Sequence, residues 1–328
     1  MPALIEPRIL KGFRDFLPPA EIRRRELIRL LEKAFQDFGF VPIDTPALEY
    51  TEVLLGKGGG ETDKQVYAFQ DQGGRNVALR FDLTVPFARF LAAHREELYL
   101  PFKRYHIAKV WRGENTQRGR YREFTQCDFD IVGSDCPGAD FEILLLMASG
   151  LELLGIGDFH IHLSHRGLFN GLVRGLGLGE KTGEILRAVD KLGKTGPAEV
   201  LGVLSGLAGE GAARQILDFT LPEDSNQATW EKIQAACAGF PEAQDGLKRL
   251  AEVLRLAGET GLAPRLTLNP SITRGLDYYD GLVYETFLDS LPRIGSVCSG
   301  GRYNNLAGLY SPEALPGVGA SIGLDRLL

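Results

Sequence analysis

The 328-residue sequence has only four cysteines and no long apolar run, and both shortages exclude classes of protein. Cys127, Cys136, Cys237 and Cys298 form no C-x-x-C pair and have no histidine-rich partner spacing. We therefore expect reduced thiols and no structural zinc. No run of about 18 apolar residues occurs, so no membrane span is expected. The charged N-terminus lacks the apolar core of a signal peptide, which predicts a cytoplasmic protein.

The sequence also lacks a strong positive charge, since its formal net charge is −6 at pH 7. An acidic chain argues against general nucleic-acid binding, although it leaves room for a local basic surface. The segment from Lys103 to Arg122 is such a place, with seven lysines and arginines beside one acid, Glu114. A salt-bridged surface hairpin is the alternative interpretation, but such a hairpin would more often mix its charges. The 44% hydrophobic content is ample for a sizeable core, and the length allows two domains.

Two strands are predicted around this basic loop, over 104–111 and 122–132. Successive strand residues point to opposite faces, so one face of the second strand carries an aromatic ring, an amide and two carboxylates. These residues are Phe124, Gln126, Asp128 and Asp130. A polyphosphate needs several fixed cations, which arginines supply as forked, permanently charged donors. An adenine needs a flat partner, which Phe124 can supply.

The first third of the chain predicts a helix, an edge strand and a strand-to-helix transition. Apolar residues recur at helical spacing over 21–39, and a glycine closes that segment. The next segment, 40–49, contains two prolines, which allow only an edge or interrupted strand. Residues 75–91 begin as a strand and continue as a helix. Asp82 and Thr84 lie at that transition, where plain helix capping is one interpretation.

Residues 170–262 are rich in Gly, Ala and Leu and predict a helical region, with helices over 184–192 and 245–257. The GLGLGEKT segment at 175–182 is close to a phosphate-binding P-loop, but Glu180 occupies the place of the second glycine. We therefore favour a helix end, a turn and the next helix for this segment.

Strands are predicted again at 265–269 and 282–287, with Asp280-Gly281 as a tight turn between them. The intervening SITRGLDYYDG segment carries four chemically notable residues: Arg274, Asp277, Tyr278 and Tyr279. Two adjacent tyrosines often pack in the hydrophobic core and at an interface. That interpretation stays open beside a role in ligand binding.

Five segments together resemble the class II aminoacyl-tRNA synthetases, and specifically the histidyl-tRNA synthetase family. The RGENTQRGRYREFTQCDFDIVG stretch at 112–133 resembles motif 2, and the helix–glycine–strand segment reaching Pro46 resembles motif 1. The C-terminal LPGVGASIGLDRLL resembles motif 3. RGLDYYDG at 274–281 and SGGRYNNL at 299–306 resemble the two histidine signatures of that family. The resemblance covers essentially the whole chain.

The resemblance implies an α+β fold, in which a mostly antiparallel sheet is flanked by helices and interrupted by a helical insertion. The implied domains are a first catalytic part at 1–169, the insertion at 170–262 and a second catalytic part at 263–328. Members of the family continue into an α/β anticodon-binding domain after motif 3. We interpret the chain, which stops at Leu328 within the expected motif 3 helix, as a catalytic fragment.

The resemblance also implies roles for individual residues. The implied ATP-binding residues are Arg112, Glu114, Arg120, Phe124 and Arg326. The implied histidine-binding residues are Asp82, Thr84, Arg112, Gln126, Asp130, Arg274, Tyr278 and Tyr279. Arg112 and Arg274 would be catalytic at the α-phosphate, Asp82 with Thr84 would hold the α-amino group, and Asp130 with Tyr279 would read the imidazole. ATP would carry Mg²⁺, and no metal ligand is assigned to the protein.

The implied activity is ATP-dependent activation of L-histidine to histidyl-adenylate, followed by transfer to tRNA(His), by a homodimer. The alternative is a non-catalytic regulatory subunit of ATP phosphoribosyltransferase, a paralogue of this fold that also lacks the anticodon-binding domain. Such paralogues tend to lose ATP-binding and catalytic residues. Here Arg112, Glu114, Arg120, Arg274 and Arg326 are all present. We therefore favour the synthetase.

Overall fold

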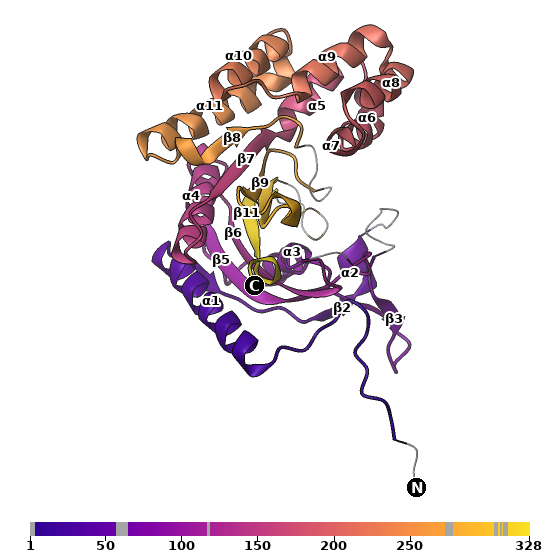
Figure 1. Ribbon diagram of the computed structural model, residues 1–328, viewed down its shortest axis with the longest axis vertical. Coiled ribbons are helices and arrows are strands. Elements are labelled where there is room, and N and C mark those ends of the chain that lie inside the picture. The colour runs from indigo at the N-terminus through magenta and orange to yellow at the C-terminus, as the bar shows by residue number, and fades with distance from the viewer. Residues whose placement is uncertain are drawn as a thin grey trace.

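The computed structural model describes residues 4–56, 65–116, 119–272, 278–304, 308, 310 and 314–328. Within these residues an eight-stranded sheet forms the centre of the molecule, in the order β1-β5-β6-β11-β10-β9-β7-β8 (Figure 1). Its strands are β1 (Val41–Pro42), β5 (Phe102–Trp111), β6 (Glu123–Val132), β7 (Phe159–His165), β8 (Leu266–Leu268), β9 (Leu282–Leu288), β10 (Cys298–Tyr303) and β11 (Gly317–Gly323). The five inner pairs are antiparallel, whereas the two outermost pairs are parallel. The predicted mostly antiparallel sheet of an α+β fold is therefore confirmed.

The segment between β1 and β5 forms a second, smaller sheet and two short helices. A three-stranded sheet has the order β2-β4-β3. These elements are β2 (Leu48–Tyr50), β3 (Ala68–Gln70), β4 (Asn76–Leu79), α2 (Thr51–Leu55) and α3 (Thr84–Ala93). The predicted strand-to-helix transition at 75–91 is confirmed as β4 followed by α3. The chain ends in α12 (Leu324–Leu327) directly after β11.

The predicted N-terminal helix is confirmed as α1 (Pro18–Asp37), which begins with a proline in its first turn. Its buried residues Leu31, Ala34 and Phe35 recur at helical spacing, and the Phe35 ring lies 5.0 Å from the Phe129 ring of β6. The helix ends at Asp37, and Gly39 follows with a positive φ of 78°, which favours a residue without a side chain. The following strand, β1, lies at the edge of the sheet, as its prolines predicted.

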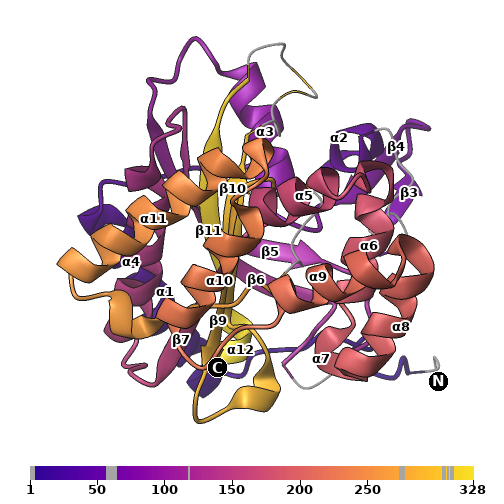
Figure 2. The ribbon, with the colours of Figure 1, turned by 90° about the horizontal axis from the view of Figure 1, so that it is seen from above.

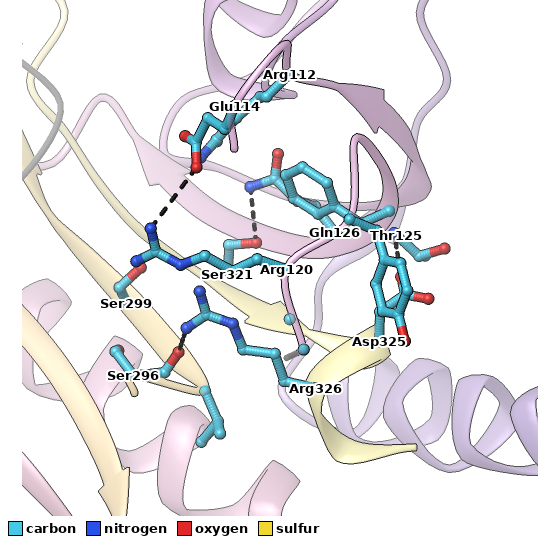
Figure 3. A pocket seen from close by; sticks show the side chains of 15 residues that line it. Arg112, Glu114, Arg120, Thr125, Gln126, Ser296, Ser299, Ser321, Asp325 and Arg326 are labelled. Carbon is cyan, nitrogen blue, oxygen red and sulfur yellow. Dashed lines mark hydrogen bonds and ion pairs between the residues drawn. The ribbon is translucent and has the colours of Figure 1, made fainter. Parts of the chain in front are cut away.

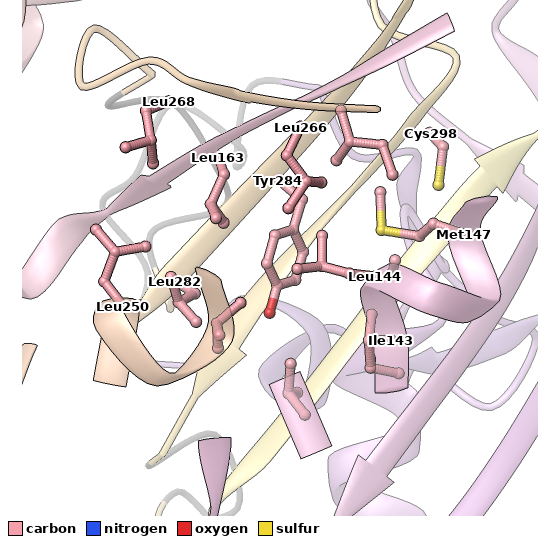
Figure 4. Close-up of a cluster of buried hydrophobic side chains, with 14 of the residues drawn as sticks. Ile143, Leu144, Met147, Leu163, Leu250, Leu266, Leu268, Leu282, Tyr284 and Cys298 are labelled. Carbon is pink, nitrogen blue, oxygen red and sulfur yellow. The ribbon is translucent and has the colours of Figure 1, made fainter. Parts of the chain in front are cut away.

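One face of the sheet is closed by an apolar core, which leaves the opposite face for the site. Helix α4 (Pro137–Leu153) packs on β6 and β11. Figure 4 shows its residues Ile143, Leu144 and Met147 among apolar side chains of the sheet and of α11. On β6, Cys127, Phe129 and Ile131 belong to this core. Because side chains alternate along a strand, the residues between them face the other way.

The helical region runs from α5 (Arg166–Gly175) to α11 (Gln244–Glu259) and lies beside the sheet (Figure 2). Between them are α6 (Thr182–Val189), α7 (Leu192–Thr195), α8 (Pro197–Ala208), α9 (Glu210–Thr220) and α10 (Asn226–Cys237). The predicted 245–257 helix is confirmed as part of α11. The 175–182 segment is a helix end, a short 3₁₀ turn and the start of α6, as favoured above. The domain boundaries of the sequence analysis remain predictions.

Two local predictions were wrong. The 184–192 segment is not one helix, because α6 ends at Val189 and α7 begins at Leu192. Asp280-Gly281 does not form the predicted tight turn, and the two strands on either side of it, β8 and β9, are not neighbours, because β7 lies between them and pairs with both. Gly281 has a packing role instead, since a Cβ there would lie 2.9 Å from the Cβ of Arg302. Sheet order therefore overrides the turn preference of this dipeptide.

All four cysteines are free thiols, and three of them are buried. In the described part of the chain, no helix is long and apolar enough to cross a membrane.

Candidate active site

The site lies where the β5–β6 hairpin meets β11 and β10. The loop after β5 carries Arg112, Glu114 and Arg120, and β6 then turns Phe124, Gln126, Asp128 and Asp130 toward two adjoining cavities. The face predicted from alternation is therefore confirmed. Across the strand pair, Ser321 of β11 lies opposite Asp128, and Gly319 lies opposite Asp130.

The first cavity, which we call the outer cavity, gathers every residue expected to bind ATP (Figure 3). Its walls include Arg112, Glu114, Arg120, Phe124, Asp325 and Arg326. Residues 112–124 come from the β5–β6 hairpin, whereas Arg326 comes from α12, about two hundred residues later. Three guanidinium groups thus face one cavity with an aromatic ring, which fits a nucleotide polyphosphate.

The position of Arg112 is set by its own contacts. Its Nε donates a hydrogen bond to the carbonyl of Phe81 over 2.8 Å, and its Cζ lies 5.1 Å from the centre of the Phe124 ring. The backbone N–H of Arg112 also donates to the carbonyl of Arg122 over 2.9 Å, which closes the hairpin. The guanidinium is therefore held in place with donors left over for an anion.

The other two cations of the outer cavity, Arg120 and Arg326, lie next to each other (Figure 3). Arg120 lies 3.6 Å from the carboxylate of Glu114, a loose pair that is partly exposed. Arg326 donates to the carbonyl of Ser296. Burial, together with the charges of Arg120 and Arg112, lowers the pKa of Arg326. Their mutual repulsion would be relieved by a bound polyanion.

Asp325 was not recognised in the sequence. It accepts a hydrogen bond from the backbone N–H of Thr125 over 2.5 Å and pairs with Arg14. These contacts join the end of the chain to β6 and to the segment before α1, so they place the neighbouring Arg326 beside the cavity. The only signal in the sequence was its position inside the motif 3 segment.

The second cavity, which we call the inner cavity, gathers the described residues expected to bind histidine. Its walls include Asp82, Thr84, Gln126, Asp130, Tyr278 and Tyr279. Among the residues that the structure describes, four line both cavities: Arg112, Gln126, Ser299 and Ser321. The two cavities therefore meet at these residues, and a molecule that spans the junction would contact Arg112. Arg274 lies outside the described residues.

Asp82 both caps a helix and lines the inner cavity. Its Oδ1 accepts the N–H of Val85 in the first turn of α3 over 3.1 Å, and its Oδ2 accepts the hydroxyl of Tyr278 over 3.2 Å. Burial raises the pKa of Asp82. The capping interpretation is thus confirmed, and it does not exclude a second role in the cavity.

Asp130 is held by two residues that sequence reasoning did not select. Arg104 of β5 forms a buried ion pair with its Oδ2 at 2.7 Å, and the Tyr303 hydroxyl donates to its Oδ1 over 2.6 Å. Burial raises the pKa of Asp130, although Arg104 acts in the opposite direction. Gly319 leaves the space that this carboxylate occupies, because a Cβ there would overlap Asp130 Oδ1. Arg104 lay in a predicted strand and Tyr303 in a quoted signature, but nothing marked them as partners.

The adjacent tyrosines belong to one aromatic cluster. The rings of Tyr278 and Tyr279 lie 4.9 Å apart, and Tyr278 lies 6.0 Å from Tyr303, both in edge-to-face geometry. Both tyrosines line the inner cavity, so their packing and their exposure to a ligand coexist. Asp128, Ser299 and Ser321 also line it and had no assigned role. Among the residues that the structure describes, no group of three or more His, Cys, Asp or Glu could hold a metal ion.

Known proteins share both the sequence and the fold. The histidyl-tRNA synthetase family profile matches residues 12–327. Histidine–tRNA ligases of Treponema denticola and Rhodopirellula baltica are 55% and 51% identical over 100% and 99% of this chain, which covers 74% of each relative. The crystal structure of histidyl-tRNA synthetase from Nostoc sp. PCC 7120 has a TM-score of 0.87 at 33% identity, over 99% of this chain and 75% of that one. A Bacillus halodurans structure described as an ATP phosphoribosyltransferase regulatory subunit/histidyl-tRNA synthetase has a TM-score of 0.86 over 99% of this chain and 83% of that one. At 21% identity, this last likeness shows the fold alone.

A mostly antiparallel sheet that carries an arginine-rich hairpin and two joined cavities defines the catalytic fold of a class II aminoacyl-tRNA synthetase. Within that class, the chain belongs to the histidyl-tRNA synthetase family.

Proposed function

We propose that the chain activates L-histidine with ATP and transfers it to tRNA(His). The observation that carries this proposal is the junction of the two cavities at Arg112 and Gln126. ATP in the outer cavity would present its α-phosphate there, and histidine in the inner cavity would present its carboxylate there. Reaction between two bound partners depends chiefly on such positioning and on neutralised charge.

In the proposed first step, a carboxylate oxygen of histidine attacks the α-phosphorus in line. The bond between the α-phosphorus and the bridging oxygen breaks, pyrophosphate leaves, and histidyl-adenylate remains. Arg112 would stabilise the charge that develops at the α-phosphate, with Arg274 as the second proposed catalytic residue. In the second step, a hydroxyl at the 3′ end of tRNA(His) attacks the carbonyl carbon of the adenylate, and AMP leaves.

The remaining assignments follow the walls of the cavities. Phe124 would stack on adenine with Glu114 beside it, while Arg120 and Arg326 would flank the β- and γ-phosphates. Asp82 and Thr84 would hold the α-amino group of histidine, and Asp130 with Tyr279 would read its imidazole. Gln126 and Tyr278 would complete the pocket.

ATP would bring Mg²⁺, whose ligands are mostly phosphate oxygens and water, so few protein ligands are needed. No carboxylate of the outer cavity is assigned to this ion, because Glu114 is placed beside adenine and Asp325 is bound to Thr125 and Arg14. The ion would neutralise phosphate charge, and the arginines would position the chain of phosphates.

The alternative of a non-catalytic regulatory subunit is disfavoured by the outer cavity. A histidine sensor needs the inner cavity alone, yet Arg112, Arg120, Phe124 and Arg326 converge on a second, adjoining one. The purified protein is expected to catalyse exchange of labelled pyrophosphate into ATP, and only when L-histidine is present. A folded protein that binds histidine but shows no exchange with any of the twenty amino acids would favour the regulatory subunit.

We also propose that the protein is a cytoplasmic homodimer. Large apolar side chains are exposed on α1 and on the neighbouring β1 and β2 edge, and they include Ile22, Leu30, Val41, Leu48 and Tyr50. A symmetric twofold contact would cover the same surface on both copies. Light scattering at micromolar concentration is expected to report twice the chain mass of 36.0 kDa, and a monomer mass would contradict the dimer.

A further inference from the structure

The inner cavity contains a buried carboxylate that no described residue fully satisfies. Asp128 is 2% exposed, and its Oδ1 has no hydrogen-bond partner among the described residues. Its carboxylate receives a hydrogen bond from the Ser321 hydroxyl, which also accepts the amide N–H of Gln126 over 3.0 Å (Figure 3). A buried acceptor without a donor is costly, so an open oxygen that lines a cavity points to a donor supplied by a ligand.

Two internal groups lie near Asp128, but neither hydrogen-bonds to its open oxygen in this structure. Arg104, on the adjacent strand, makes its 2.7 Å ion pair with Asp130. His106 lies directly across the strand pair from Asp128, but its Nε2 contacts Asp44 over 2.9 Å. Burial and the charges of Arg104 and Arg80 lower the pKa of His106 to about 3, so this ring is neutral. Arg104 Nε and Nη1 and His106 Nδ1 have no hydrogen-bond partner among the described residues, yet none of them donates to Asp128 Oδ1, which stays open toward the cavity.

The three polar residues on this face of β6 differ in what they can still bind. Gln126, at the junction with the outer cavity, has an open Oε1, and Asp128 has an open Oδ1. Asp130, the innermost, is paired with the charge of Arg104 at 2.7 Å and accepts the Tyr303 hydroxyl at its Oδ1, while its Oδ2 has the ion pair but no hydrogen bond. Burial and the charge of Asp130 raise the pKa of Asp128 to about 7, although Arg104 acts in the opposite direction. In the free protein this carboxylate is therefore poorly stabilised as an anion.

Strand geometry indicates which part of histidine reaches Asp128. Residues two apart on a strand are separated by about 7 Å, so Asp128 lies one such step beyond Gln126. The carboxylate of histidine is assigned to the junction at Gln126 and Arg112. Its ammonium group is attached to the adjacent carbon and stays close to that junction, whereas the ring nitrogens are its most distant polar atoms. Asp82 and Thr84, at the start of α3, remain available for the ammonium group.

We propose that Asp128 is a further specificity-determining residue, whose open oxygen hydrogen-bonds to a ring nitrogen of histidine in the inner cavity. Asp130 keeps its place beside the ring, where Arg104 and Tyr303 hold it rigidly. This inference deepens the proposed function and rests on it. It adds a second carboxylate to the part of the site that distinguishes histidine from amino acids without a ring N–H.

The test compares Asp128→Asn with Asp218→Asn, the same chemical change on the exposed surface of α9. Binding of two ligands is measured by calorimetry: L-histidine, and 3-(imidazol-4-yl)propionate, which keeps the ring and the carboxylate but lacks the ammonium group. A lost hydrogen bond to a charged group corresponds to roughly a tenfold to hundredfold weaker Kd. We expect that loss for both ligands in Asp128→Asn, with no change in Asp218→Asn or in ATP affinity.

The possible outcomes distinguish a failure of the proposed function from a failure of the role proposed for Asp128. If the unaltered protein fails to bind L-histidine, the proposed function itself is wrong. If it binds histidine and Asp128→Asn binds both ligands normally, the role of Asp128 is wrong. A loss for histidine alone would place Asp128 at the ammonium group and overturn the assignment to the ring. Should the Asn variant not fold, Asp128→Ser, which removes the charge with a smaller side chain, provides the same comparison.

Discussion

Arg112→Ala is expected to lower the single-turnover rate of histidyl-adenylate formation by about 10²–10³. Arg112 lines both cavities, and its guanidinium is already oriented by Phe81 and by the Phe124 ring. A fixed cation aimed at charge that develops in the transition state contributes roughly 3–4 kcal/mol, because it needs no reorganisation when the reaction occurs. Arg112→Lys should retain part of the rate, since it keeps the charge but loses the forked donors.

The matched control for this change is Lys109→Ala. Lys109 is a cation near the end of β5, three residues before Arg112, but its side chain is half-exposed and pairs with Glu123 on the surface. The Lys109→Ala substitution should leave the rate of adenylate formation within a factor of about two, because a surface ion pair contributes little energy. A different result would contradict this role. If Arg112→Ala binds both substrates more weakly but forms the adenylate at the normal rate once it is saturated, Arg112 contributes to substrate binding and not to stabilisation of the transition state.

Asp140→Ala is expected to lower the free energy of unfolding by about 3–5 kcal/mol. Asp140 is fully buried in α4, and its two oxygens accept from Arg302 of β10 and Arg249 of α11, each over 2.7 Å. Removing the carboxylate leaves the Arg302 charge buried, with its remaining contacts to the carbonyl of Ser134 and to Asp135. The cost is large because that charge cannot reach water without opening the sheet.

Urea unfolding of Asp140→Ala beside Glu142→Ala tests this estimate. Glu142 lies two residues later on α4 and pairs with Lys103, but both side chains are about 30% exposed. Its removal should cost at most about 1 kcal/mol. Equal losses for the two variants would mean that the Asp140 network adds no more stability than a partly exposed ion pair.

The β5–β6 hairpin shows what could be predicted from the sequence. Its strands and the cavity-facing row from Phe124 to Asp130 were predicted because alternation is a local property of an extended chain. The outer cavity followed from the motif resemblance, which linked this hairpin to Arg326 across two hundred residues. For the described residues, each one expected to contact a substrate lines one of the two cavities.

The partners of those residues could not be predicted in the same way. Tyr303 reaches Asp130 because β11 lies between β6 and β10, and no local pattern states that order. Arg104 pairs with Asp130 through the register of β5 on β6, and either sign of charge would have suited a strand of that composition. The predicted tight turn at Asp280-Gly281 was wrong for a related reason, since β7 separates the two strands that flank this segment in the sequence.

The most direct test of the account is a crystal structure with a non-hydrolysable analogue of histidyl-adenylate. We predict adenine against Phe124 in the outer cavity, the linking group beside Arg112 and Gln126, and the imidazole in the inner cavity near Asp128 and Tyr279. That result would show that the shared wall is where the two substrates react. An analogue bound with its two ends exchanged, or outside either cavity, would contradict the account.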